Sequence, residues 1–329
     1  MRRSHWRRAC RSNWRSSDKA MVLTVLKSGP LATLQGRARE GLRHQGIPAS
    51  GPADPLSMAL ANRLVGNPQQ ATALEITFGA AEFEFHQDTV FAFAGAAAGA
   101  SLAGAPVPAH QALEARRGDR LAFAYPSAGV RSYLAVPAGF AAENVFDSTS
   151  TFLPAAFGGF SGRALQAGDV LTGERASGPA LDLTTPAALR PHMSRTHILR
   201  CVPGPDFESI GPAIWPETFQ TTNRMDRTGL ELSGPWPQPQ DGGQKPSAAL
   251  FTGAVQLTPS GNAFVLLPDA QTTGGYPHVL QVIRADRHLL GQIAPGDRVR
   301  FLRRSVDEAY EDLRAKTDYF AAWLPGFAF

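Results

Sequence analysis

The chain has 329 residues, of which 43% are hydrophobic and 18% are charged, so it can form two domains of ordinary size, each with a buried core. Its 32 glycines and 26 prolines are spread along the whole length, which favours a β-rich protein with many turns over one built from long helices. The net charge of +4 is concentrated in residues 1–20, which carry +6, so the remainder sums to −2 and nucleic-acid binding has little support.

Residues 1–20 are rich in arginine and serine and lack the apolar stretch of a secretory signal. Met21 follows them and is itself followed at once by a strand-like segment, residues 22–26. We therefore predict that the folded part begins near Met21, and that residues 1–20 are a disordered extension or the product of a wrongly assigned start codon.

The two cysteines, Cys10 and Cys201, are too few to build a disulfide framework or a thiolate metal site, which fits a reducing compartment. Glycine, proline or charged residues interrupt every apolar stretch before it reaches the roughly eighteen residues that a membrane span requires. We therefore expect a cytoplasmic protein without a membrane span.

The clearest single element is a helix that begins after Asp54. Asp54 can cap it, Pro55 suits its first position, and Gly66 can stop it. Its apolar positions form one stripe that should pack on a sheet, namely Leu56, Ala59, Leu60 and Leu64. A second helix is predicted to start at Ser305, because Ser305 and Glu308 can form a capping box.

Short strands are predicted for much of the rest of the chain. Residues 81–85, 90–93 and 132–136 have the length, the aromatic content and the glycine or proline boundaries of strands. A Gly-Asp turn before an apolar strand recurs three times, at residues 117–121, 167–171 and 295–299. Because antiparallel barrels turn their corners in this way, the pattern predicts a mainly β fold with two related β-barrel units.

Residues 172–196 are rich in threonine, proline, alanine and serine and are predicted to connect the two units. The first unit would then comprise residues 21–190 and the second residues 191–329. Residues 234–247 are crowded with proline, glutamine and glycine and are predicted to form an exposed loop or flap, in which Lys245 is the most interesting of the few lysines.

Three stretches combine glycine with polar side chains in a way that a plain core does not require: residues 33–37 with 46–68, residues 158–163, and residues 222–230 with 253–257 and 272–277. In the last stretch, a Thr-Thr-Gly-Gly-Tyr run lets the backbone approach a ligand and present N–H groups to an anion, although a glycine-rich hairpin turn has the same pattern. Arg224 and Arg227 can clamp a carboxylate or phosphate while Asp226 orients one guanidinium, although a solvated surface cluster has the same composition.

Several well-known chemistries lack their sequence motifs. No P-loop, no Met-Lys-Met biotin acceptor and no G-x-S-x-G nucleophile elbow occurs. The histidines show neither H-x-H nor H-E-x-x-H spacing, so no metal site is predicted. Any ATP site must therefore be of another kind or be shared with another chain.

A set of short blocks runs in a fixed order through the chain, at residues 46–54, 61–68, 74–77, 131–136, 158–159, 162–165, 168–169, 224–229, 253–256, 269, 271–277 and 295–297. This ordered set resembles the KipA family, which comprises the C-type subunits of 5-oxoprolinase and is also described as allophanate hydrolase subunit 2 or a biotin-dependent carboxyltransferase domain. The resemblance covers residues 22–305, and so many blocks in one order make chance an implausible explanation.

The resemblance implies two cyclophilin-like β-barrel subdomains with a few short helices. It also implies a KipI-type partner (the B-type component) and a LamB/YcsF-type partner (the A-type component), which together with this chain hydrolyse 5-oxo-L-proline to L-glutamate with ATP. Related domains of urea carboxylase instead transfer a carboxyl group from carboxybiotin to urea, so biotin is the cofactor only in that alternative. A third alternative is a non-catalytic protein that binds and regulates a KipI-type partner.

Both reactions require a site that polarises a small amide or urea and holds an anionic group beside it. The predicted catalytic residues are Arg224, Asp226, Arg227, Gln256 and Asp269. The predicted substrate-binding residues are Gln35, Arg37, Asp54, Asn62 and Arg163 from the first unit and Thr273, Gly274, Gly275 and Tyr276 from the second. In these roles the guanidiniums hold the anion, Gln256 and the Gly-Gly backbone bind the carbonyl, and Asp269 is an orienting group or a base.

The chain departs from the usual family pattern at four places. Gly36 replaces an acid, Ala248 replaces a glutamate, and Ala270 replaces an arginine. The segment 146–151, which includes Asp147, also lacks its usual arginine. These departures leave open a different amide substrate or a non-catalytic role.

Overall fold

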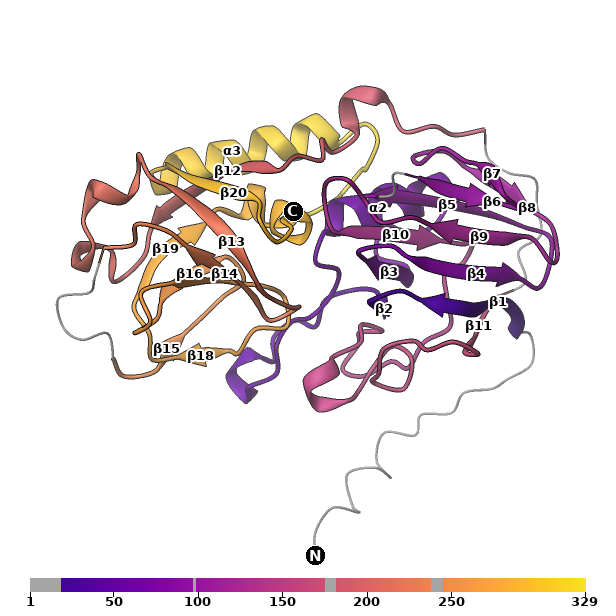
Figure 1. Cartoon of the computed structure of the whole chain (residues 1–329), viewed down its shortest axis with the longest axis horizontal. Helices are drawn as coiled ribbons and strands as arrows, with labels where there is room; N and C mark the ends of the chain where they lie inside the picture. The colour runs from indigo at the N-terminus through magenta and orange to yellow at the C-terminus, as the bar shows by residue number, and fades with distance from the viewer. Residues whose placement is uncertain (1–18, 97–98, 175–181, 238–244) are drawn as a thin grey trace, which may run out of the picture.

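The computed structural model describes residues 19–96, 99–174, 182–237 and 245–329. Two β-rich units lie side by side along the long axis of the molecule (Figure 1). The strands of the first unit fall between residues 19 and 174, and the barrel strands of the second between residues 196 and 303. The predicted mainly β fold with a few short helices is therefore confirmed, while the boundary at residue 190 stays a prediction.

The first unit consists of two antiparallel sheets that share a core. One has the strand order β11 (Val170–Glu174), β1 (Lys19–Ser28), β4 (Ala81–Phe85), β9 (Arg120–Phe123), β6 (Ala100–Leu102) and β7 (Ala105–Pro106). The other has the order β2 (Leu31–Gln35), β3 (Ala73–Thr77), β10 (Arg131–Ala135), β5 (Thr89–Gly95) and β8 (Leu113–Ala115). Alternate side chains of both sheets point inward, so Phe83 of β4, Phe93 of β5 and Phe123 of β9 meet in one aromatic cluster.

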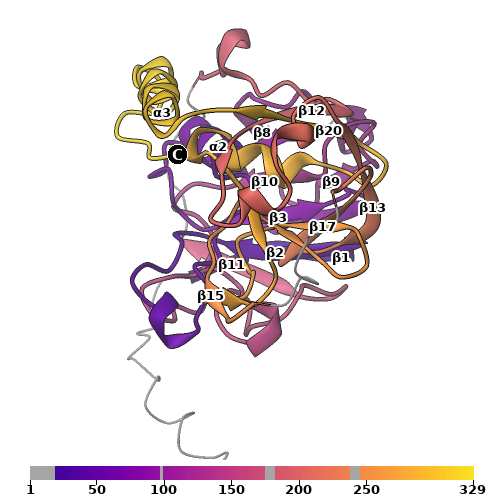
Figure 2. The same cartoon turned by 90° about the vertical axis from the view of Figure 1, so that its left-hand side faces the viewer.

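Helix α2 (Pro55–Leu64) packs against the five-stranded sheet on β5 and β10. Asp54 caps it as predicted, because its carboxylate accepts a hydrogen bond from Ser57 N at 3.0 Å. The apolar side of the helix contacts Ala92 and Tyr133. The same apolar cluster includes residues that follow the barrel in sequence, namely Phe320, Leu324, Phe327 and Phe329. The end of the second unit therefore completes the packing of the first (Figure 2).

Among the described residues, the second unit is a closed barrel of seven strands. Their order is β12 (Thr196–Pro203), β19 (His278–Val282), β16 (Ala254–Leu257), β17 (Ala263–Leu266), β14 (Gly229–Ser233), β13 (Thr218–Met225) and β20 (Arg298–Arg303). β12 and β20 pair in parallel and close the barrel, whereas the other barrel pairs are antiparallel. A small sheet of β15 (Ala248–Ala249) and β18 (Thr273–Gly274) accompanies the barrel.

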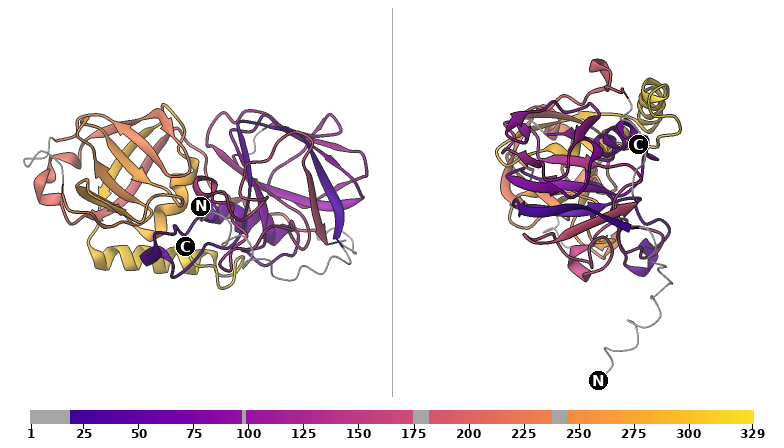
Figure 3. Two further views of the ribbon diagram at one scale, coloured as in Figure 1. Left: turned by 90° about the horizontal axis from the view of Figure 1, so that it is seen from below. Right: turned by 90° about the vertical axis from the view of Figure 1, so that its right-hand side faces the viewer.

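The remaining helices are short, apart from α3. They are η1 (Arg43–Gln45), η2 (Leu153–Ala155), η3 (Ala187–Leu189), η4 (Phe207–Ser209), η5 (Pro212–Ile214), η6 (Arg284–Gln292) and α3 (Val306–Phe320). α3 begins with the predicted capping box, in which Ser305 Oγ accepts from Glu308 N and the Glu308 carboxylate accepts from Ser305 N. α3 then runs along the barrel (Figure 3). No helix in the described part of the chain is long and apolar enough to cross a membrane.

The three predicted Gly-Asp turns share one local structure. Each glycine has a positive φ, with values of 89° at Gly118, 91° at Gly168 and 82° at Gly296. In each turn the aspartate carboxylate accepts a hydrogen bond, 2.8 to 2.9 Å long, from the backbone N–H three residues earlier; the aspartates are Asp119, Asp169 and Asp297. Each turn leads directly into a strand, β9, β11 or β20, so the prediction that these turns start strands is confirmed.

Two predicted segments fall partly outside the described residues. Of the expected extension, residues 1–18 lie outside, whereas Lys19 and Ala20 belong to β1 and pair with β11. The first strand therefore begins before Met21, because β11 offers it partners there. Of the expected flap, residues 238–244 lie outside, and Lys245 next to them forms an ion pair of 2.6 Å with Asp206.

Candidate functional site

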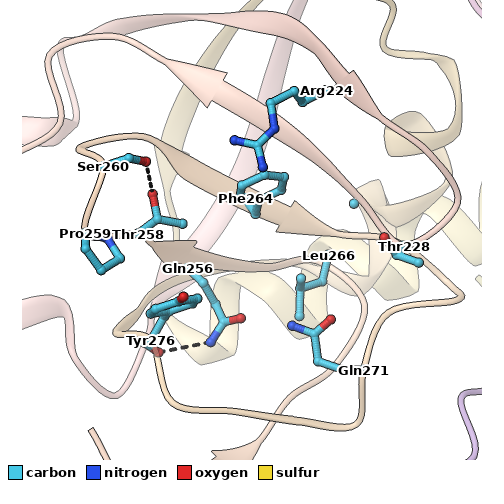
Figure 4. Close-up of a pocket in the computed structure, with 11 residues that line it drawn as sticks. Arg224, Thr228, Gln256, Thr258, Pro259, Ser260, Phe264, Leu266, Gln271 and Tyr276 are labelled. Atoms are coloured by element: carbon cyan, nitrogen blue, oxygen red, sulfur yellow. Dashed lines mark hydrogen bonds between the residues drawn. The ribbon is translucent and has the colours of Figure 1, made fainter. Parts of the chain in front are cut away.

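A cavity of about 550 Å³, which we term the barrel pocket, lies on the outer face of the second unit's barrel (Figure 4). It is lined by Arg224, Thr228, Gly229, Gln256, Thr258, Pro259, Ser260, Phe264, Leu266, Gln271 and Tyr276. The alternation of strand residues explains this lining, because Val255 and Val265 point into the barrel core while their neighbours Gln256 and Phe264 point outward. β16 and β17 thus supply one wall. Arg224 of β13, Gly229 of β14 and the neighbouring loops supply the rest.

Gln256 is buried and fixed at the centre of this wall. Its Nε2 donates a hydrogen bond to the backbone oxygen of Tyr276 at 3.0 Å, as Figure 4 shows. A Cβ on Gly274 would lie 2.6 Å from Leu250 Cδ1 and 3.1 Å from Gln256 Nε2, so the lack of a side chain at residue 274 lets this loop approach β16. The Gln256 amide is therefore held in one orientation toward the cavity.

Arg224 lies at the rim of the barrel pocket. Its side chain is 69% exposed, and its Nη1 pairs with Glu231 Oε1 at 2.8 Å. The guanidinium also lies over the ring of Phe264, at 5.2 Å from the centroid. Glu231 is itself buried and accepts a second hydrogen bond from Thr222 Oγ1 at 2.7 Å. This arrangement holds a positive charge where an anion from solvent can reach it.

Arg227, only three residues further along the chain, points away from the pocket and into the contact between the two units. Its side chain is 3% exposed, its Nε donates to Asp269 Oδ2 at 2.8 Å, and its Nη1 donates to Glu75 Oε1 at 2.5 Å. Its Nη2 donates to the backbone oxygen of Gly51 at 2.6 Å. Burial opposes the charge of Arg227, but Asp269 and Glu75 outweigh burial and raise the pKa of the guanidinium.

These contacts belong to a set of buried polar side chains that we term the interface network: Asp54, Glu75, Arg131, Tyr133, Arg227, Asp269 and Gln292. Glu75 is its centre, since it pairs with Arg227, lies 3.5 Å from Arg131 Nε and accepts a hydrogen bond from the Tyr133 hydroxyl at 2.7 Å. Burial alone would raise the pKa of Glu75, but Arg227 and Arg131 outweigh it, so the pKa is lowered.

Gln292, in the segment that follows the barrel strand β19, links the network to helix α2. Its Nε2 donates to Asp54 Oδ2 at 2.7 Å and to Arg131 O at 2.9 Å. Burial raises the pKa of Asp54, although hydrogen bonds from Ser57 and Gln292 act against this rise. A Cβ on Gly291 would lie 2.5 Å from the backbone oxygen that precedes Asp54, so the two units approach closely at this glycine.

Three further predicted site residues support local structure. Asp226 Oδ1 accepts from Thr228 N at 2.6 Å and shapes the turn between β13 and β14. Asn62 donates to a backbone oxygen beyond α2 at 2.9 Å. Arg163 forms two parallel hydrogen bonds of 2.7 Å with Asp169.

The predicted Thr-Thr-Gly-Gly-Tyr run contributes mainly through its backbone. Thr273 and Gly274 form β18, and the backbone oxygen of Gly275 accepts from Lys245 N at 2.8 Å. A Cβ on Gly275 would lie 2.7 Å from the Lys245 oxygen. Of this run, only Tyr276 lines the barrel pocket, and the ligand-site interpretation stays a prediction.

Of the two arginines near the start of the first-unit loop, Arg39 rather than the predicted Arg37 is buried. Arg37 is exposed and pairs with Glu40 at 3.4 Å. Arg39 donates to the backbone oxygens of Val145 and Ser150 and lies over an aromatic ring. Burial lowers the pKa of Arg39 to about 10. Gln35, also buried, donates to nearby oxygens, and among the described residues nothing hydrogen-bonds to its Oε1.

Among the predicted site residues, Arg224, Gln256 and Tyr276 thus line the barrel pocket, whereas Asp54, Arg227 and Asp269 belong to the interface network. The two regions meet along the chain, because Arg227 belongs to the interface network and the next residue, Thr228, lines the barrel pocket. Glu231 and Glu75 were not predicted, because a single glutamate within a strand carries no motif. In the described part of the chain, no group of three or more histidine, cysteine, aspartate or glutamate side chains could hold a metal ion.

Residues 45–303 match the carboxyltransferase domain, subdomains A and B, so the chain belongs to this family. It is 34% identical to the C-type subunit of the 5-oxoprolinase of Escherichia coli (strain K12), over 92% of this chain and 98% of that protein. The corresponding protein of Haemophilus influenzae is 32% identical, over 91% and 96% of the two chains. The crystal structure of the Kluyveromyces lactis urea amidolyase is also similar, with a TM-score of 0.85 and 28% identity over 95% of this chain and 20% of that chain.

Proposed function

We propose that the chain is the C-type subunit of an ATP-dependent 5-oxoprolinase, which hydrolyses 5-oxo-L-proline to L-glutamate together with a KipI-type and a LamB/YcsF-type partner. The observation that carries this proposal is the 34% identity to a 5-oxoprolinase component over 98% of that protein. Nearly every part of that relative has a counterpart in this chain. In this proposal, the assembled complex carries out the reaction, and this chain contributes the barrel pocket to it.

The barrel pocket suits a small cyclic amide that carries a carboxylate. Its volume of about 550 Å³ lies within the range of roughly 300–1,000 Å³ that small-molecule sites occupy. In the proposed pose, Arg224 binds the carboxylate of 5-oxoproline at the rim, where its guanidinium is open to solvent. Gln256 binds the lactam group, and Phe264 packs against the apolar edge of the ring.

Asp269 and Arg227 act as positioning residues in this proposal. They are buried and paired with each other, so they do not touch a substrate in the barrel pocket. Asp269 N donates to Arg227 O at 3.0 Å, which ties together two segments that continue into the pocket lining at Thr228 and Gln271. Of the two roles predicted for Asp269, the proposal therefore keeps the orienting role.

ATP does not fit the barrel pocket alone. Within the described lining, Arg224 is the one cationic side chain, whereas a triphosphate is bound through several cationic groups and a metal ion. The described lining also contains no aspartate or glutamate to hold that metal ion. We therefore assign the nucleotide to a partner protein or to a site that a partner shares with this chain.

A second candidate function is that of a biotin-dependent carboxyltransferase component. The observation that favours it is the TM-score of 0.85 with the Kluyveromyces lactis urea amidolyase over 95% of this chain. Its substrate would be urea or a related amide, and carboxybiotin would be supplied by other proteins. Urea has no carboxylate, so in this case the anion for Arg224 is the carboxyl group that carboxybiotin supplies.

The test is to purify the chain with its KipI-type and LamB/YcsF-type partners and to measure phosphate release and glutamate formation from 5-oxo-L-proline and ATP. We expect product from the complete set and none when this chain is omitted. A verified complex that forms no glutamate would contradict the proposal. The carboxyl transfer from carboxybiotin and the regulation of the KipI-type partner would then be measured instead.

A further inference from the structure

A second cavity, of about 270 Å³, lies between α3 and the barrel, apart from both the barrel pocket and the interface network. We term it the α3 groove. Its lining includes Val202 and Ile283 from the barrel side, Val306 and Tyr310 from α3, and Arg284 and Arg287 from η6. Figure 3 shows α3 alongside the barrel.

The first half of α3 presents an apolar stripe to this groove. Val306, Ala309, Tyr310 and Leu313 follow the spacing of one helix face. Val306 is 62% exposed and Tyr310 is 70% exposed, although the same helix buries Phe320 against the first unit at its other end. Within the described residues, the outer part of this stripe is left uncovered.

The other wall of the α3 groove is positively charged. Arg287 is largely buried, and none of the described groups forms a hydrogen bond with its Nε. Burial, followed by the like charges of Arg284 and Arg43, lowers the pKa of Arg287 to about 10. Arg284 Nε already donates to the backbone oxygen of Phe329. The lining that the structure describes contains no aspartate or glutamate side chain, and Arg287 has no carboxylate partner within it.

The exposed apolar surface beside the α3 groove favours a protein segment over a free small molecule. The cavity itself, of about 270 Å³, is close to the lower end of the roughly 300–1,000 Å³ of small-molecule sites. The exposed stripe on α3 extends the apolar surface beyond the cavity, as in sites where a peptide segment places successive side chains along a groove. A protein segment can fill the cavity and cover the stripe at the same time.

We propose that the α3 groove binds a segment of a partner protein chain, with an aspartate or glutamate against Arg284 and Arg287 and an apolar side chain beside Tyr310. The positive charge of the groove favours the acidic side chain of the partner segment, and the apolar lining favours the apolar side chain beside it. The inference rests on the proposed function in one respect, since the partner is taken to be another member of the 5-oxoprolinase assembly.

The experiment measures the dissociation constants of the full-length chain with the purified KipI-type and LamB/YcsF-type partners by isothermal titration calorimetry. The groove variants are Tyr310→Ala and Arg284→Glu. Their matched controls are Tyr125→Ala, at a 69% exposed tyrosine of the first unit, and Arg298→Glu, at an exposed arginine of β20. Melting temperatures establish that each variant is folded.

We expect each groove variant to raise the dissociation constant for one of the two partners by about tenfold or more, and each control to leave it within about twofold. Arg284→Glu should also reduce the dependence of binding on salt. Groove variants that bind as tightly as the wild type would overturn the inference, and so would a wild-type chain that binds neither partner. Glutamate formation is measured in the same samples, so a groove-dependent complex without activity would count against the proposed function alone.

Discussion

The barrel pocket and the interface network use the same residue types in opposite surroundings. Arg224 forms an ion pair with Glu231 while its side chain is 69% exposed, whereas Arg227 pairs with Asp269 and Glu75 at 3% exposure. Pairs with both partners exposed contribute about 0–1 kcal/mol, but removing one partner of a buried pair costs about 3–5 kcal/mol. The pair of Arg224 lies between these two cases, because Glu231 is 3% exposed. Burial, rather than residue type, therefore determines which arginine is available to a ligand and which one holds the two units together.

The largest expected effect is the loss of stability in Arg227→Met. This change leaves Asp269 and Glu75 buried without their shared cation, so the free energy of unfolding should fall by about 3–5 kcal/mol. Denaturant unfolding followed by fluorescence measures it. The matched control is Arg224→Met, which should cost less stability than Arg227→Met, because Arg224 is 69% exposed and the buried Glu231 keeps its hydrogen bond from Thr222. If Arg227→Met and Arg224→Met lose the same free energy of unfolding, the interface network is no more important for stability than the rim of the barrel pocket.

The next effect is on catalysis and concerns Gln256→Leu. In the proposed pose the fixed amide of Gln256 binds the reacting lactam, so its removal should lower kcat/KM of the assembled complex by about 100-fold. Steady-state glutamate formation measures it. Gln220→Leu is the control, because Gln220 lies on β13 outside the barrel pocket. A wild-type kcat/KM in Gln256→Leu would show that the lactam is bound elsewhere.

A smaller effect is expected for Arg224→Met in the same assay. Loss of the carboxylate contact should raise KM for 5-oxo-L-proline about tenfold, because the arginine binds substrate and transition state alike and kcat should change little. Arg37→Met, at the exposed arginine of the first-unit loop, offers a comparison of the two predicted anion binders. If Arg37→Met raises KM and Arg224→Met does not, the anion site lies in the first unit.

The smallest effect is the pH dependence of stability that Asp54 contributes. Its pKa is raised above 3.8 in the folded protein, so it stabilises the fold when protonated, and this contribution is lost as the pH rises through the folded pKa. Asp54→Asn keeps a capping side chain and does not titrate. Relative to the variant, the wild type should therefore lose stability from about pH 4 to about pH 7, as the pH rises above the unfolded pKa of Asp54 and through its folded pKa. Urea unfolding at both pH values measures this difference, and a gain would contradict it.

The features that could be predicted from the sequence depend on residues close together in the chain. The cap at Asp54, the capping box at Ser305 and the three Gly-Asp turns each involve positions within about four residues of one another. The barrel pocket could not be predicted in this way, because it depends on which residues of β16 and β17 face outward. The bond between Gln292 and Asp54 spans 238 residues, and no local pattern records it.

The choice between Arg37 and Arg39 shows the same limit. The two arginines lie two positions apart, and only contacts with the backbone of residues 145–150 determine which one is buried. A tertiary contact, rather than the local sequence, therefore selects the buried arginine.

The packing of residues 320–329 against α2 has a consequence for biosynthesis. The first unit emerges from the ribosome before the second. The apolar side of α2 and its neighbours on β5 and β10 can contact residues 320–329 only after the whole second unit has been translated. Domains commonly fold in the order in which they emerge, and an uncovered apolar surface invites aggregation. During translation, the first unit therefore keeps part of its apolar surface uncovered until residues 320–329 have been synthesised and pack against α2.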